Sequence, residues 1–167
     1  ALKLLNLFAH KLKNKYICLM KKYKKLDFNT DDLENLSNSD LKKVADYWLR
    51  NYLLRNTTGF GERVWCPIKK QSYHKDQIHC CHYYDRAIMS LRYDLRNVHL
   101  ISAVSNTFDA QVPKEGYKSL HHYDYEQLLI KEYGSEVLDF LRERSKEVKI
   151  FYKEDYIEVI NKFRNNE

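Results

Sequence analysis

The middle of the chain, from Ile78 to Asn106, concentrates side chains that can do acid–base and metal chemistry. In it, Asn97 follows His82 by fifteen positions, and Asn106 follows Asn97 by nine. A neutral imidazole can take a proton from water, and a second group must hold that ring in one orientation. A divalent ion on a scissile phosphate would stabilise the leaving oxygen. The segment therefore suggests metal-assisted phosphodiester cleavage, with a polar patch on a small helical protein as the alternative.

Helices are expected before this segment. Apolar residues at helical spacing predict a helix over 3–25 and a second over 39–56, which Ser39 can cap. The apolar stripe of the second helix includes Trp48 and Tyr52, which we expect to pack in the core.

Strands and further helices are expected around and after the segment. RVWCPI and QIHCCHYY suit two short strands separated by a polar turn, and VHLISAVS begins with apolar, β-branched residues. Downstream, one helical pattern ends at Gly134 and the next begins at Ser135 as its cap. The predicted order is helix, helix, a small ββ unit, then helices, which is an α+β fold that is mostly helical.

Composition bounds the function classes. At 167 residues, with 44% hydrophobic and 31% charged residues, the chain is most simply one globular domain rather than a disordered one. A net charge of +6 and a pI near 9.0 favour a polyanionic partner. Residues 1–25 hold eight lysines and no acid, so they form either a solvated helix face or an arm along phosphates.

No segment approaches the ~20 apolar residues of a membrane span, so we expect no membrane partner. The start of the chain lacks the features of a secretory signal. The four cysteines make a poor disulfide framework, because two of them, Cys80 and Cys81, are adjacent. Together these features predict a cytoplasmic protein.

Three short motifs carry a family resemblance. They are HCCHYY from His79, LRYDLRNVH from Leu91 and SAVSN from Ser102. Their spacing resembles that of HNH (ββα-metal) nucleases and, more narrowly, of the phage NinG (Rap) recombination nuclease family. WLRNYLLRN before WCPIK, and YEQLLIKEYGSEVLDFLRER near the end, are also similar to that family. The resemblance covers roughly residues 40–165.

The resemblance implies an organisation for the whole chain. It places N-terminal helices over 1–58, a central ββα-metal nuclease core over 62–112 and C-terminal helices over 117–167, all within one domain. It also implies branched recombination intermediates, such as Holliday junctions or D-loops, as the substrate. A homodimer would suit such two-fold symmetric junctions.

The same resemblance implies roles for individual residues. His82 falls on the general base, Asn97 on the residue that orients it, and Asn106 on a metal ligand from the helix. His79 and His99 are candidate ligands or phosphate contacts, although His99 could equally be a satisfied, partly buried histidine. The expected DNA-binding residues are Arg92, Arg96, Arg55, Lys21 and Lys22. For Arg92 and Arg96, surface charge is the alternative.

A structural zinc of the family is predicted to be absent here. The family holds zinc between two Cys-x-x-Cys pairs, and a tetrahedral zinc site needs four cysteine or histidine ligands. The corresponding positions here are Cys66, Lys69, Ser102 and Ser105. We expect apolar packing around Trp65 and Ile68 to replace the zinc. A rebuilt site from Cys66, Cys80, Cys81 and a histidine is the less favoured alternative.

The catalytic ion is expected to be Mg²⁺ or Mn²⁺, one per site. Many HNH enzymes place aspartate just before the base, where this chain has Cys81, and hard ions prefer carboxylate oxygen. His79, Asp85 or Asp94 could substitute, and a histidine-rich set would suit Mn²⁺. In a regular strand, however, His79 and His82 point to opposite faces.

The sequence therefore predicts a metal-dependent DNA endonuclease of the HNH type. One alternative is a catalytically degenerate HNH fold that serves as a DNA-binding or protein-interaction module. Another is a nicking or homing-type HNH enzyme with sequence specificity.

Overall fold

The computed structural model describes residues 26–57, 61–108 and 120–165. The chain divides into two compact units, residues 1–32 and 33–167. In the described part of the first unit, the backbone N–H of Asn29 donates to the carboxylate of Asp27 across a turn. The helix expected over 3–25, with Lys21 and Lys22, lies outside the described residues.

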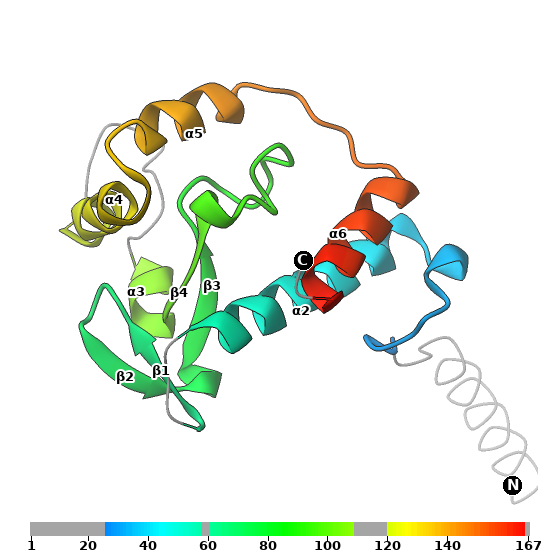
Figure 1. The fold of residues 1–167 in the computed structure, drawn as a ribbon, viewed down its shortest axis with the longest axis horizontal. Helices are drawn as coiled ribbons and strands as arrows, with labels where there is room; N and C mark the ends of the chain where they lie inside the picture. The colour runs from blue at the N-terminus through cyan, green and yellow to red at the C-terminus, as the bar shows by residue number, and fades with distance from the viewer. Residues whose placement is uncertain (1–25, 58–60, 109–119, 166–167) are drawn as a thin grey trace, which may run out of the picture. The chain divides into compact units, whose positions relative to one another are not determined.

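Two long helices pack together in the second unit. A short 3-10 turn, η1 (Leu33–Asn35), precedes α2 (Asn38–Asn56), and α6 (Lys153–Asn165) lies against α2 (Figure 1). The ring of Tyr52 packs 5.2 Å from that of Phe163. Trp48 and Tyr52 are half-buried, so the expectation that they lie in the core is only partly met.

The cap of α2 differs from the prediction. Ser37, not Ser39, is the N-cap, and its hydroxyl accepts from the backbone N–H of Asp40 at 3.1 Å. The helix therefore begins before Ser39, because Ser37 already satisfies an N–H of the first turn.

Two antiparallel hairpins follow α2. The strands β1 (Arg63–Cys66) and β2 (Gln71–His74) pair with each other, and β3 (Ile78–His82) pairs with β4 (Val98–Ser102). The predicted strands in RVWCPI and QIHCCHYY both exist, but they belong to different sheets. A second 3-10 turn, η2 (Lys75–Gln77), leads into β3, and η3 (Leu95–Asn97) leads into β4.

One helix follows β4 directly, and two more come later in the chain. They are α3 (Ala103–Phe108), α4 (Leu120–Tyr133) and α5 (Val137–Ser145). As predicted, Gly134 ends α4 with a φ of 89°, a conformation that glycine adopts without strain. Ser135 does not cap α5, since the N-cap position falls on Glu136 and makes no side-chain cap bond.

The core lies between the hairpins and α4 and α5. It contains, among others, Cys66, Ile78, Ile101, Tyr125 and Leu141. The predicted mixed α+β class is confirmed. Within the described residues, no helix combines the length and apolar character needed to cross a bilayer.

Candidate functional site around His82

His82, the expected base, ends β3 and has its ring fixed by the backbone. The side chain is 8% exposed, and Nε2 lies 3.0 Å from the carbonyl oxygen of Arg92. A carbonyl can only accept, so Nε2 carries the proton of the neutral ring. Nδ1 is therefore the nitrogen that keeps an electron pair and can take a proton from another molecule.

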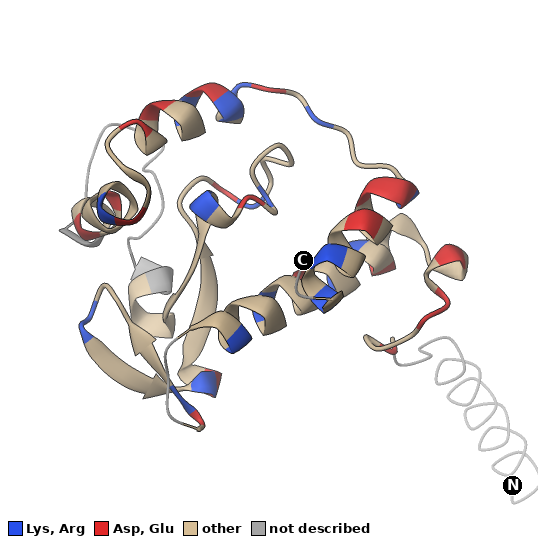
Figure 2. Cartoon of the chain, viewed as in Figure 1, with Lys and Arg blue, Asp and Glu red and all other residues tan. Residues whose placement is uncertain are grey.

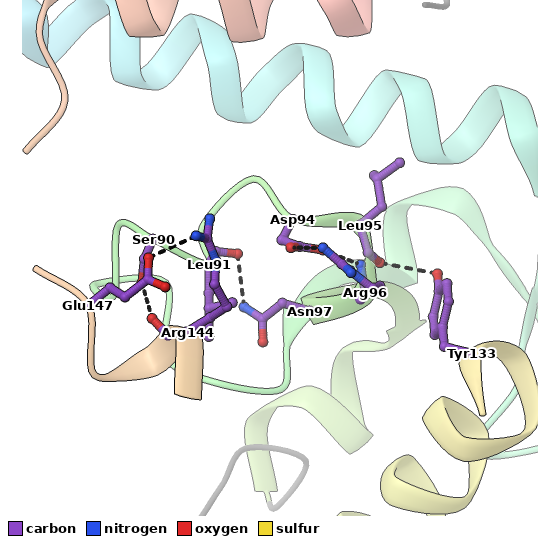
Figure 3. Close-up of polar contacts among 9 residues, drawn as sticks. All are labelled: Ser90, Leu91, Asp94, Leu95, Arg96, Asn97, Tyr133, Arg144 and Glu147. Atoms are coloured by element: carbon purple, nitrogen blue, oxygen red, sulfur yellow. Dashed lines mark hydrogen bonds and ion pairs between the residues drawn. The ribbon is translucent and has the colours of Figure 1, made fainter. Parts of the chain in front are cut away.

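The loop that supplies this carbonyl, residues 83–97, is fastened by Asn97. This side chain is fully buried in η3. Its Oδ1 accepts from the N–H of Tyr84 at 2.8 Å, and its Nδ2 donates to the carbonyls of Tyr84 at 3.2 Å and Leu91 at 3.1 Å. Figure 3 shows the contact with Leu91. Asn97 thus closes both ends of the loop.

Asn97 acts on His82 indirectly. The expectation that Asn97 itself orients the ring needs correction, because the ring bonds to Arg92 while Asn97 bonds to the backbone on either side of the loop. The physical reason is that one carboxamide offers one acceptor and two N–H donors, and here all three are used on backbone groups.

Arg92 is the largest correction to the expected DNA contacts. Its side chain is buried, and Nε and Nη2 donate to the two carboxylate oxygens of Asp46 on α2, at 3.0 and 2.5 Å. Nη1 donates to the carbonyl of Arg86 at 2.5 Å. A guanidinium used in this way holds the loop against α2 instead of facing phosphates.

The surroundings of His82 keep its ring neutral. Burial is the main cause that lowers the pKa of His82, and the positive charge of Arg92 acts in the same direction. The hydrogen bond to the Arg92 carbonyl and the carboxylate of Asp46 oppose the shift. The net direction is downward, so the ring is the neutral base at pH 7.

His99 lies on the opposite face of the same hairpin. In the β3–β4 register, His99 pairs with Cys81, whereas His82 pairs with Val98, and paired positions alternate between faces. Nδ1 of His99 lies 3.1 Å from the hydroxyl of Tyr125, and Nε2 lies 2.9 Å from a carboxylate oxygen of Glu132, both on α4. His99 is thus a satisfied, largely buried histidine, as the alternative interpretation expected.

The expected metal ligands do not come together among the described side chains. His79 is exposed and shares the face of Cys81, not that of His82. Asp94 is bound at both oxygens by Arg96. Asn106 lies in α3, but its side chain is outside the description. In the described parts of the chain, no three histidine, cysteine, aspartate or glutamate side chains group as a metal site. The described residues by themselves do not assemble the implied ion site.

The adjacent cysteines are poor substitutes as ligands. Burial raises the pKa of Cys80 and of Cys81 to about 12, so both stay protonated at neutral pH. A thiol binds metal as the thiolate.

Three of the four positions that correspond to the family's zinc ligands lie together. The backbone N–H of Ser102 points at Sγ of Cys66 at 3.2 Å, and the hydroxyls of Ser102 and Ser105 are 3.0 Å apart. All three residues are buried. Ile68 packs in the same core, as expected, but Trp65 is 43% exposed and does not fill the place of the zinc.

The other expected phosphate contacts are partly occupied. Both carboxylate oxygens of Asp94 bind Arg96, whose guanidinium stacks 3.7 Å from the ring centre of Phe140 (Figure 3 shows the ion pair). Arg55 is exposed but donates to the carbonyl of Phe163 on α6. The side chain of Arg96 is 42% exposed. It also borders a hollow that is described below.

Two acidic residues of these networks were missed from the sequence. Nothing in the sequence marks Asp46, since its partner is 46 positions away. Glu132 had a readable signal, because Tyr125, Leu129 and Glu132 recur at helical spacing and so share one face of α4.

The chain matches no protein-family model, and no curated protein or solved structure matches it. The resemblance to NinG nucleases therefore depends on the motifs and on the geometry above.

Proposed function

We propose that the chain is a DNA endonuclease of the HNH type in which His82 is the general base. The hydrogen bond between Nε2 of His82 and the carbonyl of Arg92 carries the proposal. It sets the tautomer so that Nδ1 accepts a proton from an attacking water, and burial keeps the ring neutral at pH 7. The order β3, loop, β4, α3 is the ββα order that such an enzyme requires.

Asn97 and Asp46 are positioning residues in this proposal. Asn97 fixes the two ends of the loop, and Asp46 holds the side chain of Arg92. Both determine where the Arg92 carbonyl lies and hence how the ring of His82 is turned. Neither side chain needs to touch the substrate.

The substrate class and the ion follow from the resemblance alone. Branched recombination intermediates, such as Holliday junctions or D-loops, are the proposed DNA, and Mg²⁺ or Mn²⁺ is the proposed ion. Such an ion would stabilise the charge of the phosphate at cleavage. Because the described side chains do not form its site, we assign no catalytic step to it.

Cleavage by the His82→Ala variant tests the base. Labelled four-way junctions, D-loops and linear duplexes are incubated with Mg²⁺ or Mn²⁺, and binding is measured separately without metal. We expect cutting to fall at least a thousandfold while the dissociation constant changes less than threefold, since His82 is largely buried. Cleavage retained by the variant removes His82 from the role. Asn56→Ala, on an exposed side chain of α2, is the control.

The resemblance can be tested without any activity. The triple variant Lys69→Cys, Ser102→Cys and Ser105→Cys restores all four cysteines of the family's pattern, two of them at positions that lie beside Cys66. The 3.0 Å between the serine hydroxyls is close to the roughly 3.8 Å between sulfurs around tetrahedral zinc. We expect one Zn²⁺ per chain and, with Co²⁺, the absorption of tetrahedral thiolate ligation. No tight metal binding by a folded triple variant would count against the alignment with NinG.

A second candidate function is a degenerate HNH module that binds DNA or protein without cutting. The observation that favours it is the low exposure of His82, because water and phosphate must reach Nδ1 for catalysis. DNA binding without cleavage of any of the three substrates, with either ion, would select this candidate.

A further inference from the structure

A basic hollow lies beside the loop of residues 83–97. It has a volume of about 370 Å³ and is bordered by the loop, the end of α5, the segment 146–152 and α6. Four basic side chains line it, namely Arg96, Arg144, Lys149 and Lys162. They come from four separate places in the sequence, so only the fold brings them together. Figure 2 shows basic residues at the end of α5, in the following segment and on α6.

The acids near this hollow are already engaged. Asp94, the acid that lines it, has both oxygens on Arg96. Glu147 accepts from Arg144 at 2.8 Å. Figure 3 draws both pairs, together with the hydrogen bond from Ser90 to the carbonyl of Arg144 that ties the loop to α5. The arginine charges are therefore largely compensated before any ligand arrives.

The two lysines differ from the arginines. Both are exposed, and their described contacts are with aromatic faces: Nζ of Lys149 lies 4.7 Å from the ring centre of Phe151, and Nζ of Lys162 lies 5.6 Å from that of Phe163. A ring face attracts a cation without neutralising its charge. Lys162 also borders a second hollow, whose lining includes Glu34, Glu154 and Glu158. Lys149 thus brings its positive charge to the basic hollow alone, whereas Lys162 lies between the basic hollow and this acidic one.

The segment that carries Lys149 turns it toward the hollow. Lys149 and Phe151 both line the hollow. The residues next to them, Val148, Ile150 and Tyr152, are exposed and are not part of its lining. This alternation places a charge and a ring on one side of the segment. A lysine ammonium binds a phosphate as a point charge, and an aromatic ring beside it can stack on a base.

The hollow adjoins the residues that hold the proposed base. Ser90 and Tyr93 line it, and they flank Arg92, whose carbonyl bonds to His82. We infer that Lys149 and Lys162 bind the phosphodiester backbone of the DNA whose cleavage His82 is proposed to catalyse. This inference rests on the proposed function and adds to it a contact surface built by α5, α6 and the segment between them.

The test is the double variant Lys149→Ala and Lys162→Ala of the full chain. Binding of fluorescent duplex and four-way-junction DNA is measured by anisotropy in metal-free buffer between 50 and 200 mM KCl. Losing two phosphate contacts should weaken binding roughly tenfold or more near 0.1 M salt. The slope of log K against log salt should become shallower by about 1 to 2. Both lysines are exposed, so circular dichroism and thermal unfolding should be unchanged.

The matched control removes two lysines elsewhere. Lys70 and Lys131 are also exposed and border another hollow, of about 470 Å³, that contains Asp124. The variant Lys70→Ala with Lys131→Ala should bind within twofold of the unmodified chain. Lys149→Arg with Lys162→Arg should keep the affinity, since arginine also binds phosphate.

Several outcomes would overturn the inference. They are unchanged binding by the Lys149/Lys162 variant, an equal loss in the control variant, or no DNA binding by the unmodified chain. Displacement of DNA by polyglutamate at equal charge concentration would indicate an acidic protein partner instead. Failure of the proposed function can be told apart from failure of this inference. In that case the chain binds DNA through these lysines but cuts none of the substrates.

Discussion

The two faces of the β3–β4 hairpin carry one histidine each, in opposite kinds of polar surroundings. Toward α2, a backbone carbonyl holds one nitrogen of His82, so Nδ1 keeps a defined electron pair. Toward α4, both nitrogens of His99 have side-chain partners. A ring with both nitrogens bonded is suited to holding elements together, whereas a ring fixed at one nitrogen is prepared for proton transfer.

The two networks are about equally exposed but differ in the kind of side chain that is buried. On the α2 face, Arg92 is buried and receives the carboxylate of Asp46, whose side chain is 38% exposed. On the α4 face, Glu132 is 41% exposed and bonds the buried ring of His99. A buried guanidinium always carries its charge and depends on its carboxylate, whereas an imidazole can be satisfied by hydrogen bonds as a neutral ring. The α2 face should therefore be the less tolerant of substitution.

The largest expected effect is that of Asn97→Ala. It leaves a buried carbonyl and a partly buried carbonyl and N–H of the loop without their partner, which should cost about 3 kcal/mol of unfolding free energy. Urea denaturation measures the change. Asn56→Ala, which removes one exposed hydrogen bond, should cost less than about 0.5 kcal/mol. A loss below about 1 kcal/mol for Asn97→Ala would mean that the loop does not depend on this side chain.

The next effect compares the two carboxylates directly. Asp46→Ala leaves the Arg92 guanidinium buried without its ion pair, and with allowance for the partial exposure of Asp46 the cost should be about 2 to 3 kcal/mol. Glu132→Ala should cost less than about 1 kcal/mol. Both are measured by urea unfolding at pH 7. Equal costs would show that the two faces do not differ as described.

The smallest effect concerns pH. Since burial lowers the pKa of His82 below its ordinary value near 6.5, the unfolded chain binds a proton there that the folded chain does not. The contribution of the neutral His82 ring to the unfolding free energy is complete above pH 6.5. It is lost as the pH falls from 6.5 to the lowered pKa of His82. The unfolding free energy should therefore decline between pH 7 and 5, and less steeply in His82→Gln. Parallel declines in the two proteins would contradict the lowered pKa.

The α4 face should respond at a more acid pH. The hydrogen bond with His99 lowers the pKa of Glu132, so the stability that this carboxylate contributes is present above its ordinary value near 4.5. It is lost only as the pH falls through the lowered value. Glu132→Gln should thus change the stability profile below pH 4.5, whereas His82→Gln changes it near 6.

Local patterns in the sequence determined the elements of this protein. The apolar stripe of α2, the β-branched start of β4 and the glycine after α4 each specify an element through contacts between near neighbours. They predicted the mixed α+β class. The predicted N-cap was wrong by two residues for α2 and by one residue for α5. At the start of α2, two nearby serines can each accept from N–H groups of the first turn.

Only the tertiary structure decided which strands pair, which face each histidine occupies and what each charge contacts. The pairing of β3 with β4 spans a fifteen-residue loop, and the ion pair between Asp46 and Arg92 joins residues 46 positions apart. Arg92 was expected at phosphates from the family resemblance, yet burial beside α2 makes a protein carboxylate its partner. Burial and distant partners arise only when the chain is folded, and these two quantities fix the chemistry of a side chain.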